Sequence, residues 1–177
     1  LIVAALIGFT FQIYCDFSGY SDIARGAARL LGFKLLLNFR RPYWSLSPTE
    51  FWQRWHITLS NWFRDYVYIA LGGNRVGYSR LYFNLFATMT LSGLWHGASA
   101  NFILWGAYHG GLLLIHRLIK PLLPQRPTFL PPWLANTLSR SFTFAFVAYG
   151  WLLFRITEWS QIKIYTISMV SNFSFAS

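Results

Sequence analysis

His96 is the residue of this sequence best placed to carry out chemistry. Between Arg80 and Arg117 the chain contains no Asp, Glu, Lys or Arg, and three histidines are the ionisable side chains there. Histidine exchanges a proton near neutral pH, and an ionisable side chain at membrane depth is a functional-site hypothesis by default. The small residues Gly93 and Gly97 flank it and leave room for a substrate beside the ring. The sequence therefore makes His96 a candidate functional residue, and a hydrogen-bonded packing residue is the alternative.

A second histidine, His56, follows a strong helix-start signal. Ser47 precedes Pro48 at the first helical position and Glu50 at the third, which is the order of a capping box. We expect one helix from residue 48 to Gly72-Gly73, with His56 near its middle among aromatic side chains. Either a hydrogen-bonded packing residue or a second functional group fits this pattern. In the predicted helix, the spacing places Trp52, Leu59 or Ser60, and Phe63 on the same face as His56.

Metal-ligand and nucleophile arrangements have weaker support. His109 and His116 lie seven residues apart on one predicted helix face, but no carboxylate occurs between Asp65 and His116 to complete a metal site. We therefore predict no metal. A serine nucleophile would be Ser92 or Ser99 beside a histidine, yet neither lies in a Gly-x-Ser-x-Gly motif.

Composition indicates a membrane protein. The 177 residues are 55% hydrophobic and 20% aromatic, and only 11% are charged, against roughly 25% in soluble domains. The net charge of +10 could suit nucleic acid, but Lys and Arg are scattered between apolar blocks, often beside Trp and Tyr, as at a membrane interface. We therefore predict contact with a lipid bilayer and no nucleic acid. The single cysteine, Cys15, excludes an intrachain disulfide.

The predicted elements are all helices, so the expected fold class is all-α, a polytopic transmembrane helical bundle. Apolar residues predict a helix over 1–15, and the charges after it predict an amphipathic helix over 23–37. The uncharged stretch supplies one long helix, or two that meet near Ser99-Ala100-Asn101. Prolines crowded between residues 121 and 132 predict a loop, and residues 138–156 predict a further span.

The two ends of the chain indicate a partial sequence. The chain opens on the apolar run LIVAALIGFTFQIYC without a Met or a charged region before it, so a signal peptide is a poor interpretation. We expect this run to be the downstream end of a membrane helix, and the chain to be a piece of a larger polytopic protein.

The motifs around the two histidines resemble those of the membrane-bound O-acyltransferase family. His56 lies in EFWQRWHITLS, residues 50–60, and His96 lies in GLWHG, residues 93–97. The strings YCDFSGYSD (14–22) and NFRRPYW (38–44) resemble the same family, and FRDYVYIALGGNR (63–75) is most similar to its bacterial alginate O-acetyltransferase branch. The resemblance covers about residues 10–120. It implies that residues 1–177 are the C-terminal part of one integral-membrane acyltransferase domain.

The resemblance implies that an acyl group passes from a donor on one side of the membrane to a hydroxyl acceptor on the other. His96 matches the main catalytic position of the family, and His56 matches its second motif position. Burial among apolar groups should keep a His96 imidazole neutral and able to accept the hydroxyl proton. No bound cofactor is implied, and acetyl-CoA is a candidate donor. We also expect substrate contacts from Trp95, Asp16, Ser60 and Asn61.

The implied setting is the bacterial cytoplasmic (inner) membrane, where a multi-pass protein would serve O-acetylation of an exported polysaccharide. An extracytoplasmic acetyltransferase is the expected partner protein. A second branch of the same family moves D-alanyl groups toward teichoic acids, so that reaction is an alternative. From different classes, a transporter with proton-relaying histidines or a scaffold for a partner enzyme also fits the residues.

Overall fold

All regular elements of the structure are helices. The structure is a computed structural model that describes residues 2–122 and 130–171, and no strand occurs in these ranges. The predicted all-α class is therefore confirmed. In chain order the elements are α1 (Ile2–Leu30), the 3-10 turn η1 (Pro42–Trp44), α2 (Pro48–Arg54), α3 (Ile57–Phe63), the π-helical turn η2 (Arg64–Tyr68), α4 (Tyr78–Trp95), α5 (Ala100–Ile119), α6 (Pro132–Arg155) and α7 (Trp159–Ser171).

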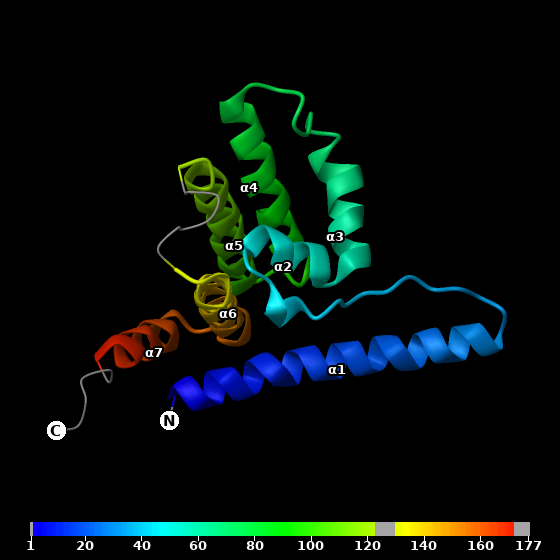
Figure 1. Ribbon diagram of the computed structural model, residues 1–177, viewed down its shortest axis with the longest axis horizontal. Coiled ribbons are helices and arrows are strands. Elements are labelled where there is room, and N and C mark those ends of the chain that lie inside the picture. The colour runs from blue at the N-terminus through cyan, green and yellow to red at the C-terminus, as the bar shows by residue number, and fades with distance from the viewer. Residues whose placement is uncertain (1, 123–129, 172–177) are drawn as a thin grey trace.

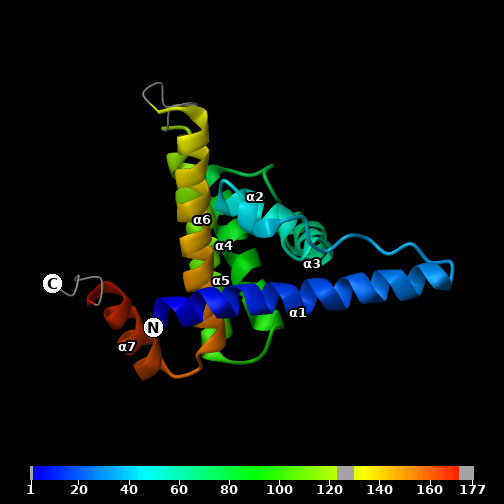
Figure 2. The same ribbon diagram turned by 60° about the horizontal axis from the view of Figure 1, so that its bottom comes forward.

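The helices α4, α5 and α6 lie side by side and form the body of the molecule (Figures 1 and 2). The short helix α2 contacts both α5 and α6, and α3 continues from it toward η2 and α4. Helix α1 crosses α6 and extends away from the body, and α7 contacts α1. The body built from α2 to α6 therefore encloses most of the site, and Ile13 and Phe17 of α1 complete its wall.

Two of the described helices, α1 and α5, are long and apolar enough to cross a membrane. The span predicted over residues 138–156 lies inside α6, which begins earlier, at Pro132, and is not one of these two helices. Polar side chains such as Asn136, Ser139 and Arg140 are frequent in its first half, which lowers its hydropathy. Most of the predicted proline-rich loop, residues 123–129, lies outside the described residues.

The helices predicted over 1–15 and 23–37 form one continuous helix, α1, so the predicted break between them was wrong. Some of the polar side chains at the expected junction, including Ser18 and Asp22, make their contacts within the helix itself. The Ser18 hydroxyl donates to the Cys15 carbonyl oxygen at 3.5 Å, and Arg25 pairs with Asp22 at 3.1 Å. These local contacts allow a polar cluster to continue a helix that it was expected to end.

Helix α1 ends at Leu30, seven residues before the predicted end of its second part. Gly32 adopts a positive φ of 83°, which is the left-handed conformation that ends many helices. The Phe33 N–H then bonds to the Ala28 carbonyl oxygen at 2.8 Å, which completes a Schellman motif. The chain beyond this point is non-helical as far as η1, and this segment later supports the site.

Aromatic rings form the core between α2, α5 and α6. Phe51, Trp55, Trp105 and Trp151 are all buried. The ring centroids of Trp55 and Trp151 lie 4.7 Å apart, and Trp105 stacks on Trp151 at 5.9 Å. Such ring pairs contribute about 0.5–1.5 kcal/mol each beyond their buried area. The core is therefore a rigid wall against which neighbouring side chains can be held.

The uncharged stretch forms two helices, α4 and α5, which meet near Ser99 as predicted. They approach so closely that a Cβ placed on Gly93 would lie 2.1 Å from the Phe102 carbonyl oxygen. A Cβ on Gly106 would lie 2.5 Å from the Met89 carbonyl oxygen. The close helix contact therefore requires glycine at both positions, and it brings the end of α4 against α5.

We expect Gly106→Val to lower the amount of full-length protein in membranes, because α4 and α5 would have to separate. Overpacking of this kind typically costs about 1–3 kcal/mol. The matched control is Gly111→Val on the same helix, where an added Cβ meets nothing within 4 Å. Quantitative immunoblots and thermal unfolding in detergent measure the difference. Equal abundance and stability of the two variants would contradict the close contact.

Candidate active site

His56 lies in a sharp break between α2 and α3, not in the middle of one helix as predicted. Its backbone is left-handed, with φ 42° and ψ 55°, which is uncommon for a residue other than glycine. The predicted common face of Trp52, His56, Ser60 and Phe63 is therefore wrong, because the residues after the break belong to a different helix. Because His56 lies between the two helices, the direction of its side chain is not set by the helical geometry of either one.

Both ends of the predicted helical segment agree with the structure. The Ser47 hydroxyl accepts from the Glu50 N–H at 3.2 Å, and the Glu50 carboxylate accepts from the Leu46 N–H at 2.6 Å. At the other end Gly72 and Gly73 have positive φ values of 108° and 53°, and the helical segment stops before α4. Local sequence signals therefore placed the two ends of this segment but missed the break inside it.

The extended segment before η1 holds the break in place. The Arg40 N–H donates to the Arg54 carbonyl oxygen at 3.0 Å, and the Ile57 N–H donates to the Asn38 carbonyl oxygen at 2.9 Å. The Asn38 side-chain oxygen also accepts from the Thr58 N–H at 3.3 Å and from its hydroxyl at 2.6 Å. Backbone groups that an interrupted helix leaves unpaired are thus satisfied on both sides of the histidine.

His96 directly follows α4 and is packed among aromatic rings. Its ring centroid lies 5.2 Å from that of Trp105, 5.1 Å from that of Phe154 and 5.1 Å from that of Trp95. The Trp105 and Phe154 rings stand nearly perpendicular to it, at 89° and 85°. The His96 backbone N–H donates to the Gly93 carbonyl oxygen at 3.0 Å. The imidazole is therefore held by side chains from α5 and α6 at a fixed position beside α4.

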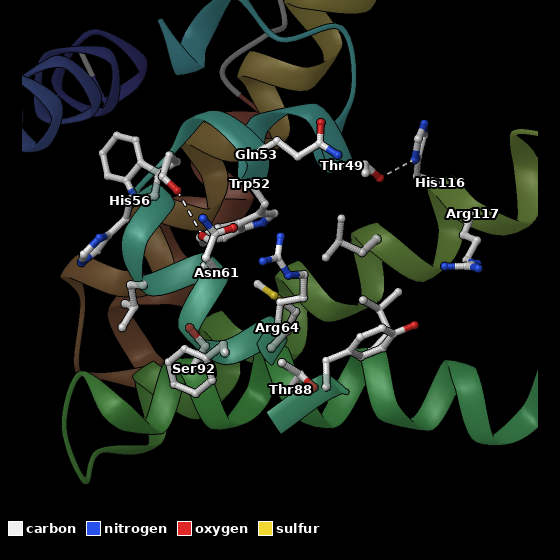
Figure 3. Close-up of a pocket in the computed structure, with 18 of the residues that line it drawn as sticks. Thr49, Trp52, Gln53, His56, Asn61, Arg64, Thr88, Ser92, His116 and Arg117 are labelled. Atoms are coloured by element: carbon white, nitrogen blue, oxygen red, sulfur yellow. Dashed lines mark hydrogen bonds between the residues drawn. The ribbon is translucent and has the colours of Figure 1, made fainter. Parts of the chain in front are cut away.

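Both histidines line one cavity of about 1030 Å³, which is bounded mainly by α2, α3, α4 and α5. Figure 3 shows part of this cavity wall, including His56 and Asn61. The predicted substrate contacts Trp95, Ser60 and Asn61 also line it. Asp16 does not: it is exposed on α1 and takes no part in the cavity wall. The volume is at the upper end of the roughly 300–1,000 Å³ typical of ligand pockets.

The cavity has two chemically different ends. His56 lies at one end, whereas His116 and Arg117 lie at the other (Figure 3). The Nδ1 atom of His116 is 3.0 Å from the Thr49 hydroxyl, and this contact links α5 to α2. Arg117 and Lys120 both line this second end. The second end therefore favours anionic groups, while the first combines imidazole and aromatic side chains.

His56 is uncharged at neutral pH. Burial and, to a smaller extent, the nearby His96 lower the pKa of the His56 imidazole to about 4. This residue lies outside both α1 and α5, the helices that could cross a membrane. Its Nδ1 atom is buried and has no hydrogen-bond partner among the residues the structure describes. A neutral imidazole with an unused nitrogen can bind a polar group of a substrate.

The remaining candidates from the sequence lie in different settings. His109 is buried in α5 behind the cavity, where its ring centroid lies 5.1 Å from that of Trp52. The described part of the chain contains no group of three or more His, Cys, Asp or Glu side chains that could hold a metal. Ser92 is buried and lines the cavity, whereas Ser99 precedes α5 and does not line it.

Several cavity residues were not found by sequence reasoning. The missed residues come from several different helices, and many are aromatic or amide side chains. In a sequence rich in Trp and Phe, an aromatic residue has the same pattern whether it faces lipid, core or cavity. Examples are Gln53, Tyr82, Trp105, Trp151 and Phe154.

Two helices long and apolar enough to cross a membrane and a large cavity lined by His56, His96 and His116 are the main features of the described structure. Comparison with known proteins gives the class. The family model MBOAT, for membrane-bound O-acyltransferases, matches residues 1–157, and the chain belongs to this family. The family predicted from the motifs is therefore confirmed.

The curated relatives are named for the transfer of two different groups, acetyl and D-alanyl. The chain is 51% identical over 150 residues to the probable alginate O-acetylase AlgI of Pseudomonas putida, covering 84% of this chain and 29% of that protein. It is 42% identical over 149 residues to the peptidoglycan O-acetyltransferase of Helicobacter pylori, covering 84% and 28%. It is 33% identical over 161 residues to the teichoic acid D-alanyltransferase of Bacillus subtilis, covering 84% and 40%. The chain thus spans less than half the length of each of these relatives.

Proposed function

We propose that the full-length protein transfers an acetyl group to hydroxyl groups of an exported polysaccharide, with His96 as general base. The observation that carries this proposal is that His96 and His56, from separate elements, line one cavity. The similarity to an alginate O-acetylase and a peptidoglycan O-acetyltransferase supports acetyl transfer to a polysaccharide. The bacterial inner membrane, crossed several times, is the proposed location.

His96 would remove the proton that the acceptor hydroxyl must lose as its oxygen attacks the acyl carbon. A hydroxyl releases this proton only to a base held within hydrogen-bond reach, and such catalysis typically contributes about 10²- to 10⁴-fold in rate. The packing of His96 between Trp105 and Phe154 fixes the ring for this purpose. Direct transfer to the acceptor needs no nucleophile from the protein, so Ser92 has no required part in the chemistry.

His56 would bind the acyl donor and polarise its carbonyl group. Its buried, unpartnered Nδ1 atom and its uncharged state at neutral pH suit a hydrogen bond to a polar group of the donor. At the other end of the cavity, Arg117 and Lys120 would attract the phosphates of a donor such as acetyl-CoA. The acyl group would then reach the histidines while the anionic part of the donor stayed at the cationic end.

The D-alanyl transfer named for the Bacillus subtilis relative is the alternative within the family. Identity is higher to the alginate and peptidoglycan relatives, 51% and 42%, than to that protein, 33%, which favours acetyl transfer. An extracytoplasmic acetyltransferase is the proposed partner, which would work with the protein at the outer face of the membrane. A transporter or a scaffold would share the membrane setting but would form no ester.

Inside-out membrane vesicles that contain the full-length protein and enclose the polysaccharide test this function when radiolabelled acetyl-CoA is supplied from outside. We expect label to appear in alkali-labile esters, and the label should be absent from vesicles of a strain that lacks the gene. Labelled D-alanyl donor supplied in parallel should give no product. Ester formation from D-alanyl and not from acetyl would favour the alternative, and no ester from either would contradict acyl transfer.

A further inference from the structure

Three of the five tryptophans that line the cavity have a buried indole nitrogen. We call Trp52, Trp105 and Trp151 the indole cluster; each of them lines the cavity wall. The indole nitrogen of each is buried; those of Trp52 and Trp105 have no hydrogen-bond partner within the described residues, whereas the Trp151 indole interacts with the Tyr43 hydroxyl. Trp105 and Trp151 are each only 1% exposed. Two N–H donors with no acceptor, on Trp52 and Trp105, therefore belong to the wall of a space large enough for a substrate.

A buried donor without a partner is unfavourable, because folding removes its hydrogen bond to water and supplies nothing in return. Proteins keep such groups rarely, and each one calls for an explanation such as a catalytic role or a missing ligand. An indole can only donate, so its partner must be an acceptor atom. A carbonyl oxygen of a bound acyl group is an acceptor that this cavity would contain during the proposed reaction.

Within the indole cluster, Trp105 is the ring that touches His96. Their centroids lie 5.2 Å apart with the planes at 89°, whereas Trp52 and Trp151 contact Trp105 instead, at 5.7 Å and 5.9 Å. His109 supports the Trp105 ring from within α5, at 5.1 Å. The Trp105 ring is therefore fixed beside the proposed base, where the acyl carbon must come to react.

We propose that the Trp105 indole N–H donates a hydrogen bond to the carbonyl oxygen of the acyl group as it is transferred, and so stabilises the negative charge that develops there. This inference rests on the proposed function. A preorganised donor in a site that excludes water acts on the transition state at no cost of reorganisation. His56 would contribute a second hydrogen bond from another side of the cavity.

The step balances with a thioester donor such as acetyl-CoA. The acceptor oxygen forms a bond to the carbonyl carbon, its proton passes to His96, and the π electron pair of the carbonyl moves onto the oxygen beside Trp105. When that pair returns to re-form the C=O bond, the bond from carbon to sulfur breaks. The departing thiolate takes the proton from His96, so the base is regenerated and one ester is formed.

The test is Trp105→Phe in the full-length protein, with kcat and KM for acetyl-CoA measured on vesicles normalised for protein amount. Removing one such donor typically lowers kcat by about 10²- to 10³-fold. We expect this loss with little change in KM. A second variant with β-(3-benzothienyl)alanine at position 105 keeps the shape of the indole but replaces N–H by sulfur, and it should lose kcat equally.

Two controls separate chemistry from packing. Val147→Ala removes buried volume from α6 outside the cavity wall, and it should lower abundance but not kcat per molecule. Trp133→Phe makes the same chemical change at an exposed position and should be neutral. Full kcat in the benzothienyl variant would overturn the inference, even if Trp105→Phe were inactive, because only the shape of the ring would then matter.

The inference and the proposed function fail in different ways. Normal kcat in both position-105 variants, together with loss of activity in His96→Gln, would reject the Trp105 assignment and leave acyl transfer intact. A loss of kcat from Trp151→Phe instead of Trp105→Phe would move the donor to the neighbouring ring and also overturn the assignment. If the wild-type protein transfers no acyl group, both proposals fall together.

Discussion

His96→Gln in the full-length protein is expected to abolish most O-acetylation while leaving the protein at its normal level in the membrane. Glutamine keeps a hydrogen-bonding side chain of similar size but cannot take up and release a proton. Loss of a positioned base should cost about 10²- to 10⁴-fold in rate, or roughly 3–5 kcal/mol of transition-state stabilisation. The exported polymer would be made in normal amounts and be nearly free of acetyl esters, which alkaline release and chromatography measure.

Two companion measurements make this result specific to a base. His96→Ala should recover part of its activity when imidazole is added, because the cavity of about 1030 Å³ has room for the missing ring. A proton-relaying transporter predicts altered proton or substrate flux and no selective loss of ester. Near-normal acetylation in the His96→Gln strain would end the proposed mechanism.

Removal of the His56 side chain is expected to have the second-largest effect, a fall in kcat of about 10²- to 10³-fold, which is typical for loss of one donor to a developing oxyanion. The left-handed backbone of His56 determines which variant is informative. His56→Gly removes the imidazole and relieves the strain of about 1–2 kcal/mol that a left-handed backbone imposes on a residue with a Cβ, whereas His56→Ala removes the imidazole and keeps that strain. Both should lose activity, and His56→Ala should also be less abundant than His56→Gly.

A third variant at this position separates the roles of side chain and backbone. His56→Asn suits a left-handed residue and keeps one hydrogen-bond donor, so part of the activity should return relative to His56→Gly. Per-molecule kcat measured on membranes of known protein content distinguishes the cases. If activity follows abundance across the three variants, His56 is a packing residue and has no place in the mechanism.

The sequence alone determined the features that depend on local signals. The capping box at Ser47, the paired glycines at Gly72-Gly73 and the turn near Ser99 could all be predicted, because each is set by residues within a few positions of one another. The all-α class followed from the predicted helices, His96 stood out because charged residues are absent between Arg80 and Arg117, and His56 stood out by the motif around it.

The features that the sequence did not predict depend on residues distant along the chain. No glycine or proline marks the break at His56; it exists because Asn38 and Arg40 supply hydrogen bonds to residues 54–58. In α1, contacts within the helix satisfied part of the polar cluster that was expected to end it, and Gly32 set its true end.

The grouping of the site residues was likewise decided by tertiary structure. Packing of α2 against α5, and of the π-helical turn η2 against α4, put His56 and His96 on one cavity and left Asp16 outside it. The same packing buried the Trp105 indole beside His96 without a partner. A hydrogen bond or ring contact between distant segments depends on how the helices pack, and the residues near one position in the sequence do not determine that packing. The sequence therefore identified the chemical groups, and only the packed helices placed them around a common space.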